Sequence, residues 1–423
     1  MNSYNQTLKY LYGLQTRGMK FGLRNTRMLL RAVGNPERTF ASIHIAGTNG
    51  KGSTAAFLAS MFMEAGYRTG LYTSPHLIRF TERIRIDGVE IPEERLVRYA
   101  DSLRPTIELV HATFFEATTC IAFQYFADER VDIAIVETGL GGRVDSTNLL
   151  KPLVSIITTI AFDHQEYLGN TIKSIAREKG GIIKPGVPLV TGVSDPEALG
   201  VLRRIAAKRR APFHLVRGSH ALPGGLRPGF SGPHQVLNAR LAVTAVSLLH
   251  ARNVAGRTFG RLDPAAVRRG LARVRLNTGL RARLEAWHGS KRILLDVAHN
   301  PDGIRTLIDA LPSSAKGGLV VVFGVMRDKD YVSMVNHLVP VSKTLIVVSP
   351  RTGRALPTGE LYLVARKAGG NVRKAGSVRN GVGRAMKAAG KSGCVLITGS
   401  HYVVGEALQF LEKGRNVSAR GHV

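Results

Sequence analysis

Two series of short apolar runs, separated by amphipathic stretches, constrain the fold of this chain more than any other feature. The runs of the first series are rich in β-branched residues and have the length of buried strands. They cover residues 42–46, 68–73, 131–137 and 152–160. A helical pattern over residues 54–66 follows the first run and ends in a glycine. This alternation predicts an α/β fold with a mostly parallel sheet covered by helices.

A second series of the same kind begins near Ala286. Its apolar runs cover residues 291–299, 318–326, 343–350 and 393–400. A chain of 423 residues is longer than one hydrophobic core usually serves, so this series predicts a separate, smaller α/β domain of Rossmann-like type. The boundary falls in the polar connection of residues 275–280, and the two expected domains are residues 1–277 and 278–423.

The formal net charge of +29 raises the question of a nucleic-acid partner. The basic residues form only modest clusters, such as Lys208, Arg209 and Arg210. Aromatic residues make up 6% of the chain and do not alternate with the basic ones, so a stacking platform for bases is not predicted. We interpret the charge as a solvated basic surface that favours polyanionic ligands such as nucleotides and polyglutamates. A compositional bias of the whole chain is the equal alternative.

The sequence also bears on the cellular compartment. Its apolar runs are too short to cross a bilayer, and the start of the chain is too polar for a signal peptide. Cys120 and Cys394 are the only cysteines, and both lie in apolar sequence, where free cysteines usually pack as small hydrophobes. We therefore expect a cytoplasmic monomer without membrane or nucleic-acid partners.

Residues 46–53, AGTNGKGS, follow a predicted strand and open a predicted helix, which is the setting of a phosphate-binding loop. Glycines allow backbone N–H groups to turn toward phosphate oxygens, and the helix N-terminus adds a favourable dipole. Lys51 would reach the β- and γ-phosphates. The loop departs from the common GxxxxGK[ST] pattern, because Ile45 replaces its first glycine and Gly52 stands at the hydroxyl position. The predicted nucleotide-binding residues are Thr48, Asn49, Gly50, Lys51, Gly52 and Ser53.

Polar side chains stand where the other predicted strands of the first series end. They are Ser74, Glu137 and, beyond Asp163, His164. Ligands bind outside the carboxyl ends of the strands in a parallel α/β sheet, so these donors should converge near the loop. Oxygen and nitrogen donors of this kind suit divalent ions that bridge ATP phosphates. Taken singly, Ser74 could be a turn residue, Glu137 could pair with Arg143, and His164 could be a satisfied buried histidine.

Residues 176–186, AREKGGIIKPG, contain a lysine of special interest. A lysine that is held near Mg²⁺ and partly desolvated can lose its proton and react with CO₂ to form a carbamate. The reaction would turn a cation into a metal-facing carboxylate. For Lys179, a surface salt bridge with Glu178 is the ordinary alternative.

Six motifs occur in order along the chain: AGTNGKGS, YTSPHL, ETGLGGRVDSTN, DHQEYLG, EKGGIIKPG and DVAHNPDG. Together they resemble the folylpolyglutamate synthase/dihydrofolate synthase family of the Mur ligase superfamily. The resemblance extends from residues 21–30 to residues 398–408, which is essentially the whole chain. It implies a P-loop, Mur-ligase-like central domain and a C-terminal glutamate-ligase domain.

The resemblance also assigns roles to matching positions. Lys51 and its loop would bind ATP, Ser74, Glu137 and His164 would bind two Mg²⁺ ions, and Lys179 would be carbamylated. In the second domain, Arg283 and Asp296 would contact ATP and His299 would lie beside the reacting phosphate. The family's PGR reads Arg281-Ala282-Arg283 here, so either arginine could make that contact. Pterin contacts would come from Phe115, Arg143 and Asp145.

Three of these residues have ordinary alternatives. Arg283 could solvate the linker, Asp296 could cap the helix that follows it, and Phe115 could be a core residue. The family's GSLY reads GSHY, and nothing in the sequence explains His401.

The implied reaction is the ATP-dependent ligation of L-glutamate to dihydropteroate, to the γ-carboxylate of a (poly)glutamyl tetrahydrofolate, or to both, through an acyl phosphate. Lys51, Lys179 and His299 are its expected catalytic residues. A single-activity folylpolyglutamate synthase and another Mur-type amino-acid ligase are the alternatives within the superfamily. A basic P-loop protein that binds nucleic acid is the alternative from a different class, but it gives no reason for the residues at the strand ends.

Overall fold

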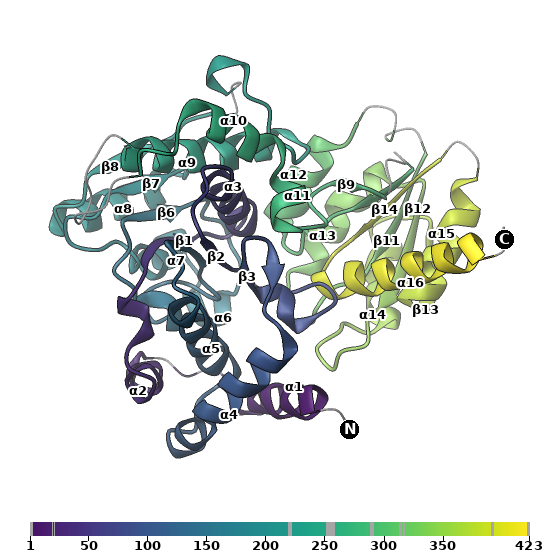
Figure 1. Ribbon diagram of the computed structural model, residues 1–423. Helices are drawn as coiled ribbons and strands as arrows, with labels where there is room; N and C mark the ends of the chain where they lie inside the picture. Colours follow the sequence, from purple (N-terminus) through teal and green to yellow (C-terminus); the bar gives the residue numbers. More distant parts are fainter. Residues whose placement is uncertain are drawn as a thin grey trace. The chain divides into compact units, whose positions relative to one another are not determined.

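The computed structural model describes residues 3–18, 20, 22–218, 222–250, 259–287, 292–312, 315, 318–390 and 393–420. These residues form two compact units (Figure 1). Unit 1 comprises residues 1–229 and 235–280, and unit 2 comprises residues 230–234 and 281–423. The division between Leu280 and Arg281 lies at the end of the polar connection.

Unit 1 is built on an eight-stranded sheet with the order β4-β3-β2-β5-β1-β6-β7-β8. Its strands are β1 (Ala41–Ala46), β2 (Thr69–Tyr72), β3 (Ile84–Ile86), β4 (Val89–Glu90), β5 (Ile133–Glu137), β6 (Val154–Ile157), β7 (Leu189–Thr191) and β8 (Phe213–Leu215). From β2 to β8 all neighbours are parallel, and β3 and β4 add an antiparallel hairpin at one edge. The central strands β1, β5 and β6 are buried throughout, as expected of a parallel sheet with both faces covered.

The helices of unit 1 pack on this sheet and on one another. They are α1 (Ser3–Gly13), α2 (Arg24–Ala32), α3 (Lys51–Glu64), α4 (Glu93–Leu109), α5 (Phe114–Asp128), α6 (Gln165–Leu168), α7 (Ile172–Gly180), α8 (Pro196–Lys208), α9 (Pro233–His250), α10 (Pro264–Ala272) and α11 (Val274–Thr278). The α3 helix packs against β1, β2 and β5 and is itself covered by α10 and α11, while α4 and α5 pack with α1 and α2. The α3 helix is buried over most of its length because apolar and small residues occupy all of its faces.

Unit 2 is built on a six-stranded sheet with the order β13-β12-β11-β14-β10-β9. Its strands are β9 (Glu285–Ala286), β10 (Ile293–Leu295), β11 (Leu319–Phe323), β12 (Thr344–Ser349), β13 (Val372–Ser377) and β14 (Cys394–Thr398). All neighbours are parallel except β9 and β10. The helices are α12 (Pro301–Ala310), α13 (Tyr331–Leu338), α14 (Thr358–Lys367), α15 (Val378–Ala389) and α16 (His401–Arg420).

The predicted α/β class and mostly parallel sheet are confirmed. The four apolar runs of the first series contain β1, β2, β5 and β6, and those of the second contain β10, β11, β12 and β14. The sequence patterns did not identify the antiparallel edge hairpin β3–β4, the short strands β7, β8 and β9, or the six-residue strand β13. Among the described helices, none is long and apolar enough to cross a membrane.

Candidate active site

The phosphate-loop motif of unit 1 connects the end of β1 to the start of α3. Gly47 and Gly50 have φ angles of 153° and 86°, a region that L side chains rarely adopt, and α3 begins at Lys51. The Lys51 ammonium turns back on the loop and donates to the carbonyl oxygens of Gly47 and Thr48, both at 3.1 Å. The loop therefore offers a helix N-terminus and a lysine to an anionic ligand.

Glu137, the last residue of β5, faces the same loop. Its Oε1 atom lies 3.9 Å from the Lys51 Nζ atom, and its Oε2 atom accepts a hydrogen bond of 3.3 Å from the backbone N–H of Ser74. The Glu137 residue is only 4% exposed. The alternative pairing with Arg143 does not form, because the Arg143 guanidinium pairs with Glu178 at 2.9 Å. Strand β5 and the end of β2 thus bring Glu137, Ser74 and Lys51 together.

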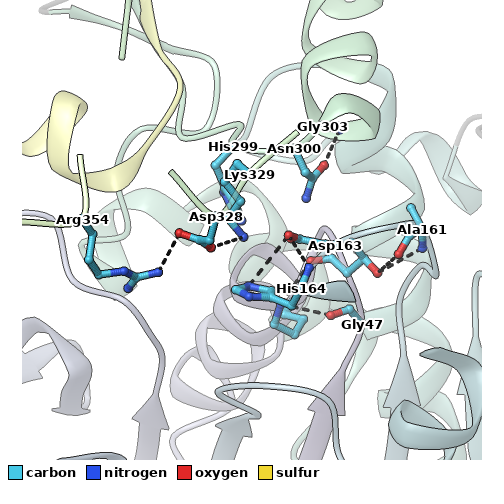
Figure 2. A network of polar contacts seen from close by, with 12 residues as sticks. Gly47, Ala161, Asp163, His164, His299, Asn300, Gly303, Asp328, Lys329 and Arg354 are labelled. Carbon is cyan, nitrogen blue, oxygen red and sulfur yellow. Dashed lines mark hydrogen bonds and ion pairs between the residues drawn. The ribbon is translucent and has the colours of Figure 1, made fainter. Parts of the chain in front are cut away.

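His164 lies in the loop after β6 and immediately precedes α6. It has a left-handed backbone conformation, with φ 51° and ψ 41°. Its backbone N–H donates to Asp163 Oδ1 at 2.9 Å, and its Nε2 atom is 3.9 Å from the same oxygen. Figure 2 draws Asp163 and His164 together with Gly47 and Ala161 of the same unit. Within the described ranges, no cluster of three or more His, Cys, Asp or Glu side chains could hold a metal ion by itself.

Lys179, near the end of α7, is buried rather than paired on the surface. The residue is 4% exposed, and its Nζ atom donates to the Gly47 carbonyl oxygen at 2.9 Å. The neighbouring Glu178 bonds to Arg143 instead. The carbonyl of Gly47 therefore accepts from two lysine ammonium groups, those of Lys51 and Lys179. Two buried or partly buried cations at one carbonyl make the loop electropositive, which favours polyphosphate.

The residues predicted to contact a pterin lie around the loop that follows β5. The Phe115 ring fills the space beside Gly139, where an added Cβ would meet the Phe115 Cζ atom at 2.3 Å. Asp145 is buried, and its carboxylate accepts from the Leu140 backbone N–H at 2.8 Å. Burial raises the pKa of the Asp145 carboxyl, although its backbone hydrogen bonds oppose the rise. Phe115 and Asp145 thus share this loop, whereas Arg143 extends from it into an exposed ion pair.

A buried histidine supports Asp145 from the central strand β1. The Thr147 hydroxyl donates its hydrogen to Asp145 Oδ1, so the His44 Nε2–H group must donate to Thr147, at 2.7 Å. Burial, with a smaller contribution from Lys184, lowers the pKa of His44 to about 3 and keeps the ring neutral. The sequence reading placed His44 in a strand but assigned it no role.

In unit 2, Asp296 directly follows β10 and binds the backbone of two neighbouring segments. Its carboxylate accepts from the backbone N–H groups of Leu284 and Ala298, both at 2.8 Å. Burial raises the pKa of the Asp296 carboxyl, and the electrostatic effects of the His234 ring and the Arg283 guanidinium oppose the rise. Asp296 does not cap α12, because Asn300 is the N-cap and accepts from the Gly303 N–H, a bond that Figure 2 shows.

The choice between the two arginines of residues 281–283 has a structural basis. The Arg281 guanidinium is engaged with Glu285 at 3.0 Å and Glu412 at 2.9 Å, and it lies 5.4 Å from the Trp287 ring centre. Arg283 instead acts electrostatically on Asp296. Arg281 therefore has a structural task, and Arg283 is the better candidate for a nucleotide contact.

His299, which precedes the N-cap residue Asn300 of α12, has a fixed ring orientation. Its Nδ1 atom lies 2.9 Å from the Val297 carbonyl oxygen and must therefore donate to it. The ring centre of His401, the residue with no explanation in the sequence, is 5.6 Å away. Two further charged contacts in this unit join Asp328 to Lys329 at 3.8 Å and to Arg354 at 3.1 Å (Figure 2). The sequence reading did not identify Asp328 or Lys329.

Three further polar residues of unit 1 touch the phosphate loop and were not predicted. Thr158 and Thr159 follow β6 and bond to Asn49. Asn238 of α9 occupies the space that the missing side chain of Gly50 leaves, with its Oδ1 atom 2.3 Å from an added Cβ. The adjacent threonines after an apolar run were the only sequence signal for the first two, and the polar Gln235 and Asn238 in an apolar helix were the signal for the third.

Comparison with known protein families identifies the class to which these two units belong. Residues 45–212 match the Mur ligase middle domain. Residues 282–401 match the Mur ligase glutamate ligase domain. The first match includes the phosphate loop, Glu137, His164 and Lys179, and the second includes Asp296 and His299. The chain is thus a Mur ligase in both of its units.

The relatives narrow this class to a family. The dihydrofolate synthase/folylpolyglutamate synthase of Bacillus subtilis is 37% identical over 388 residues, which cover 85% of this chain and 88% of the relative. A structure of Mycobacterium tuberculosis folylpolyglutamate synthase complexed with ADP has a TM-score of 0.86 at 30% identity and covers 96% of this chain and 98% of its own. An Escherichia coli FolC structure in complex with DHPP and ADP has a TM-score of 0.85 at 29% identity and covers 97% of this chain and 98% of its own.

The chain belongs to the folylpolyglutamate synthase/dihydrofolate synthase family of the Mur ligase superfamily. Membership in this family makes the protein an ATP-dependent ligase. The resemblance stated from the six sequence motifs is therefore confirmed. The roles of the individual site residues remain predictions.

Proposed function

We propose that the protein joins L-glutamate to dihydropteroate and to the γ-carboxylate of (poly)glutamyl tetrahydrofolate, as a bifunctional dihydrofolate synthase/folylpolyglutamate synthase. The observation that carries this proposal is the meeting of Lys51, Lys179 and Glu137 at the phosphate loop. The Phe115 ring of α5 lies beside Gly139 of the loop that contains Asp145, and this pairing supports a pterin-bearing acceptor. Relatives named for both activities support the bifunctional assignment.

The reaction has two steps. A carboxylate oxygen of the acceptor attacks the γ-phosphorus of ATP in line, the bond to the bridging oxygen breaks, and ADP leaves with that electron pair. The amine of glutamate then attacks the carbonyl carbon of the acyl phosphate, loses a proton, and phosphate leaves from the tetrahedral intermediate. The protein contributes by positioning and charge compensation, with Lys51 stabilising the negative charge on the transferred phosphoryl group.

The donor set at the loop fits divalent metal ions bound together with ATP. Glu137 provides a buried carboxylate, Ser74 a hydroxyl and His164 an imidazole, and the fixed contacts of Glu137 with Ser74 and Lys51 orient its two oxygens. These residues would hold two Mg²⁺ ions, which compensate phosphate charge when bound. Mg²⁺ in nucleotide sites is usually held by one or two carboxylates together with substrate phosphates, so the nucleotide would complete this coordination.

A carbamate on Lys179 would add a negative charge beside the phosphate loop, where a metal ion could bind it. The ammonium beside Gly47 would first lose one proton, and its Nζ lone pair would then form a bond to the carbon of CO₂ with loss of a second proton, so that a carboxylate replaces the cation. Its burial and the proximity of a second ammonium, that of Lys51, to the same carbonyl both favour loss of the proton. Lys179 is also placed to orient the loop while it remains a cation.

Unit 2 would contribute to the nucleotide and to the reacting phosphate. Asp296 retains acceptor capacity beyond its two backbone bonds and suits a ribose hydroxyl, with Arg283 as the accompanying cation. His299 presents an imidazole whose Nδ1 atom is committed to the Val297 carbonyl, so its Nε2 atom is the one that would meet a phosphate oxygen. These assignments make His299 a catalytic residue and Asp296 a binding residue.

The partners are ATP, glutamate and a pterin or folate, and we propose that the protein acts as a monomer. The two cysteines are unpaired and buried, which supports a reducing, cytoplasmic location. A single-activity folylpolyglutamate synthase is the second candidate function, since a curated relative from Lacticaseibacillus casei carries only that name.

One experiment tests the function and separates its two activities. Purified protein receives ATP, Mg²⁺ and labelled glutamate with either dihydropteroate or a reduced monoglutamyl folate. Label should enter a product with both acceptors, whereas label with the folate alone would leave the single-activity enzyme. Lys51→Ala should abolish turnover without loss of folded structure by circular dichroism, and near-normal activity in that variant would refute the assigned site.

A further inference from the structure

We infer that Thr158 and Thr159 are positioning residues that hold the phosphate loop in its ATP-binding form. This inference rests on the proposed ATP site. The two threonines follow β6, the parallel neighbour of β1, and β1 leads directly into the loop. Where the backbone hydrogen bonds between β1 and β6 end, the hydroxyl groups of these threonines bind the loop instead.

Both backbone groups of Asn49 are bound by these hydroxyls. The Asn49 N–H donates to Thr159 Oγ1 at 3.0 Å, and the Asn49 carbonyl accepts from Thr159 at 3.2 Å and from Thr158 at 2.6 Å. Each hydroxyl has one hydrogen, and that of Thr158 goes to the Asn49 carbonyl at 2.6 Å rather than to the more distant Ala46 carbonyl at 3.4 Å. Asn49, at the turn of the loop, therefore has its orientation set by the adjacent strand.

The neighbouring loop residues continue the same connection. The Thr48 hydroxyl donates to the Ala161 carbonyl at 3.1 Å and accepts from the Ala161 N–H at 3.0 Å, and the Thr48 N–H donates to the Thr159 carbonyl at 2.8 Å. Gly47 leaves room for this packing, because an added Cβ would lie 1.9 Å from Thr158 Oγ1. The loop is thus joined to residues 158–161 by side-chain hydrogen bonds in both directions.

This arrangement decides which N–H groups face the phosphates. Those of Thr48 and Asn49 are committed to the segment after β6, whereas the first N–H groups of α3, which starts at Lys51, have no acceptor within the helix. The hydroxyls therefore direct the N–H groups from Lys51 onward to the ligand before it arrives. Such preorganisation lowers the free-energy cost of binding. The same bonds tie the loop to the segment that leads to Asp163 and His164.

The test compares Thr159→Val with a matched threonine elsewhere in the sheet. Thr191 is buried, whereas Thr159 is partly buried; the Thr191 hydroxyl likewise donates to a backbone carbonyl, that of Ile157, and accepts from a backbone N–H, that of Val193. Calorimetry measures affinity for a non-hydrolysable ATP analogue, and steady-state kinetics measure the KM values for ATP and for the acceptor. Thr159→Val leaves the Asn49 N–H without its acceptor, so the affinity for the analogue should fall about tenfold. The KM for the acceptor should stay within about twofold.

The conservative and matched variants separate positioning from a general loss of stability. Thr159→Ser keeps the hydroxyl and should restore affinity, while Thr191→Val should reduce stability and leave affinity unchanged. Thr158→Val is the second variant and should weaken binding about threefold, which also tests the inference if Thr159→Val does not fold. Analogue affinity in Thr159→Val equal to wild type, or an equal loss in Thr191→Val, would overturn the inference. Failure of the wild-type protein to bind the analogue would instead refute the proposed ATP site.

Discussion

Replacing the buried His44 by glutamine should make the stability of unit 1 less sensitive to acid. His44 is fully buried in β1 and has a pKa of about 3, against an ordinary value of 6.5. The folded state therefore stays unprotonated at pH values where the unfolded chain binds a proton at this ring. Because the folded pKa is lowered, stability is lost as the pH falls below about 6.5, and the loss levels off near pH 3. A glutamine side chain has no such titration and retains an N–H donor for Thr147.

The two pKa values give the magnitude. At pH 5 the unfolded histidine is almost fully protonated and the folded one almost fully neutral, so His44 alone destabilises the fold by about 2 kcal/mol relative to pH 7. The slope near pH 5 corresponds to about one proton, or ~1.4 kcal/mol for each pH unit. His76, whose pKa is also lowered to about 3, contributes equally to wild type and variant and cancels from their difference.

Urea unfolding at pH 7 and pH 5 tests this prediction. Circular dichroism follows both units, and the fluorescence of Trp287, the single tryptophan, follows unit 2 and serves as an internal control. The substitution costs stability at every pH, so the informative quantity is the change between the two pH values. That change should be about 2 kcal/mol smaller in His44→Gln than in wild type. An equal change in the two proteins would refute the assignment of a neutral His44 in the folded state.

Three further outcomes follow from particular contacts. Arg281→Met should lower the free energy of unfolding of unit 2 by about 2 kcal/mol, because Glu285 stays buried without its cation. This value is smaller than for a fully buried pair because the Arg281 side chain is 30% exposed. Urea unfolding followed by Trp287 fluorescence measures the change, and an unchanged midpoint would contradict the prediction. Gly47→Ala should lower the affinity for an ATP analogue at least about 100-fold in calorimetry, because its Cβ would overlap Thr158 and its φ is positive; wild-type affinity would show that the loop adapts. Phe115→Ala should raise the KM for the pterin acceptor about tenfold and leave the KM for ATP unchanged, and equal effects on both substrates would place the ring in the core.

The fold could be predicted from the sequence wherever the pattern of buried residues is strong. Strands β1, β5 and β6 are buried on both faces, which produces the uninterrupted apolar runs that marked them. The hairpin β3–β4 was missed although it contains a signal. Asp87 and Gly88 have φ angles of 49° and 80°, the pair of positive values that a two-residue hairpin with an Asp-Gly turn requires. Strands β7 and β8 are too short for periodicity to identify.

The site was predictable to the extent that it depends on strand ends. Ligands bind at the carboxyl ends of parallel strands, and this rule predicted that Ser74 and Glu137 lie near the phosphate loop. In the structure the Ser74 N–H donates to the Glu137 carboxylate there. The reach of Lys179 to the Gly47 carbonyl could not be foreseen, because it depends on how α7 packs. The support of Asp145 by His44 joins residues far apart in sequence through a buried hydroxyl, and no local pattern encodes it. Contacts of this kind follow from tertiary packing rather than from spacing along the chain.

The fate of one oxygen atom tests the central claim most directly. An acceptor labelled with oxygen-18 in its reacting carboxylate is incubated with the protein, ATP, Mg²⁺ and glutamate, and the released phosphate is analysed by mass spectrometry. An acyl phosphate transfers one carboxylate oxygen to phosphorus, so the account predicts one oxygen-18 atom in each phosphate formed with product, together with ADP. Unlabelled phosphate, or AMP as the nucleotide product, would contradict it.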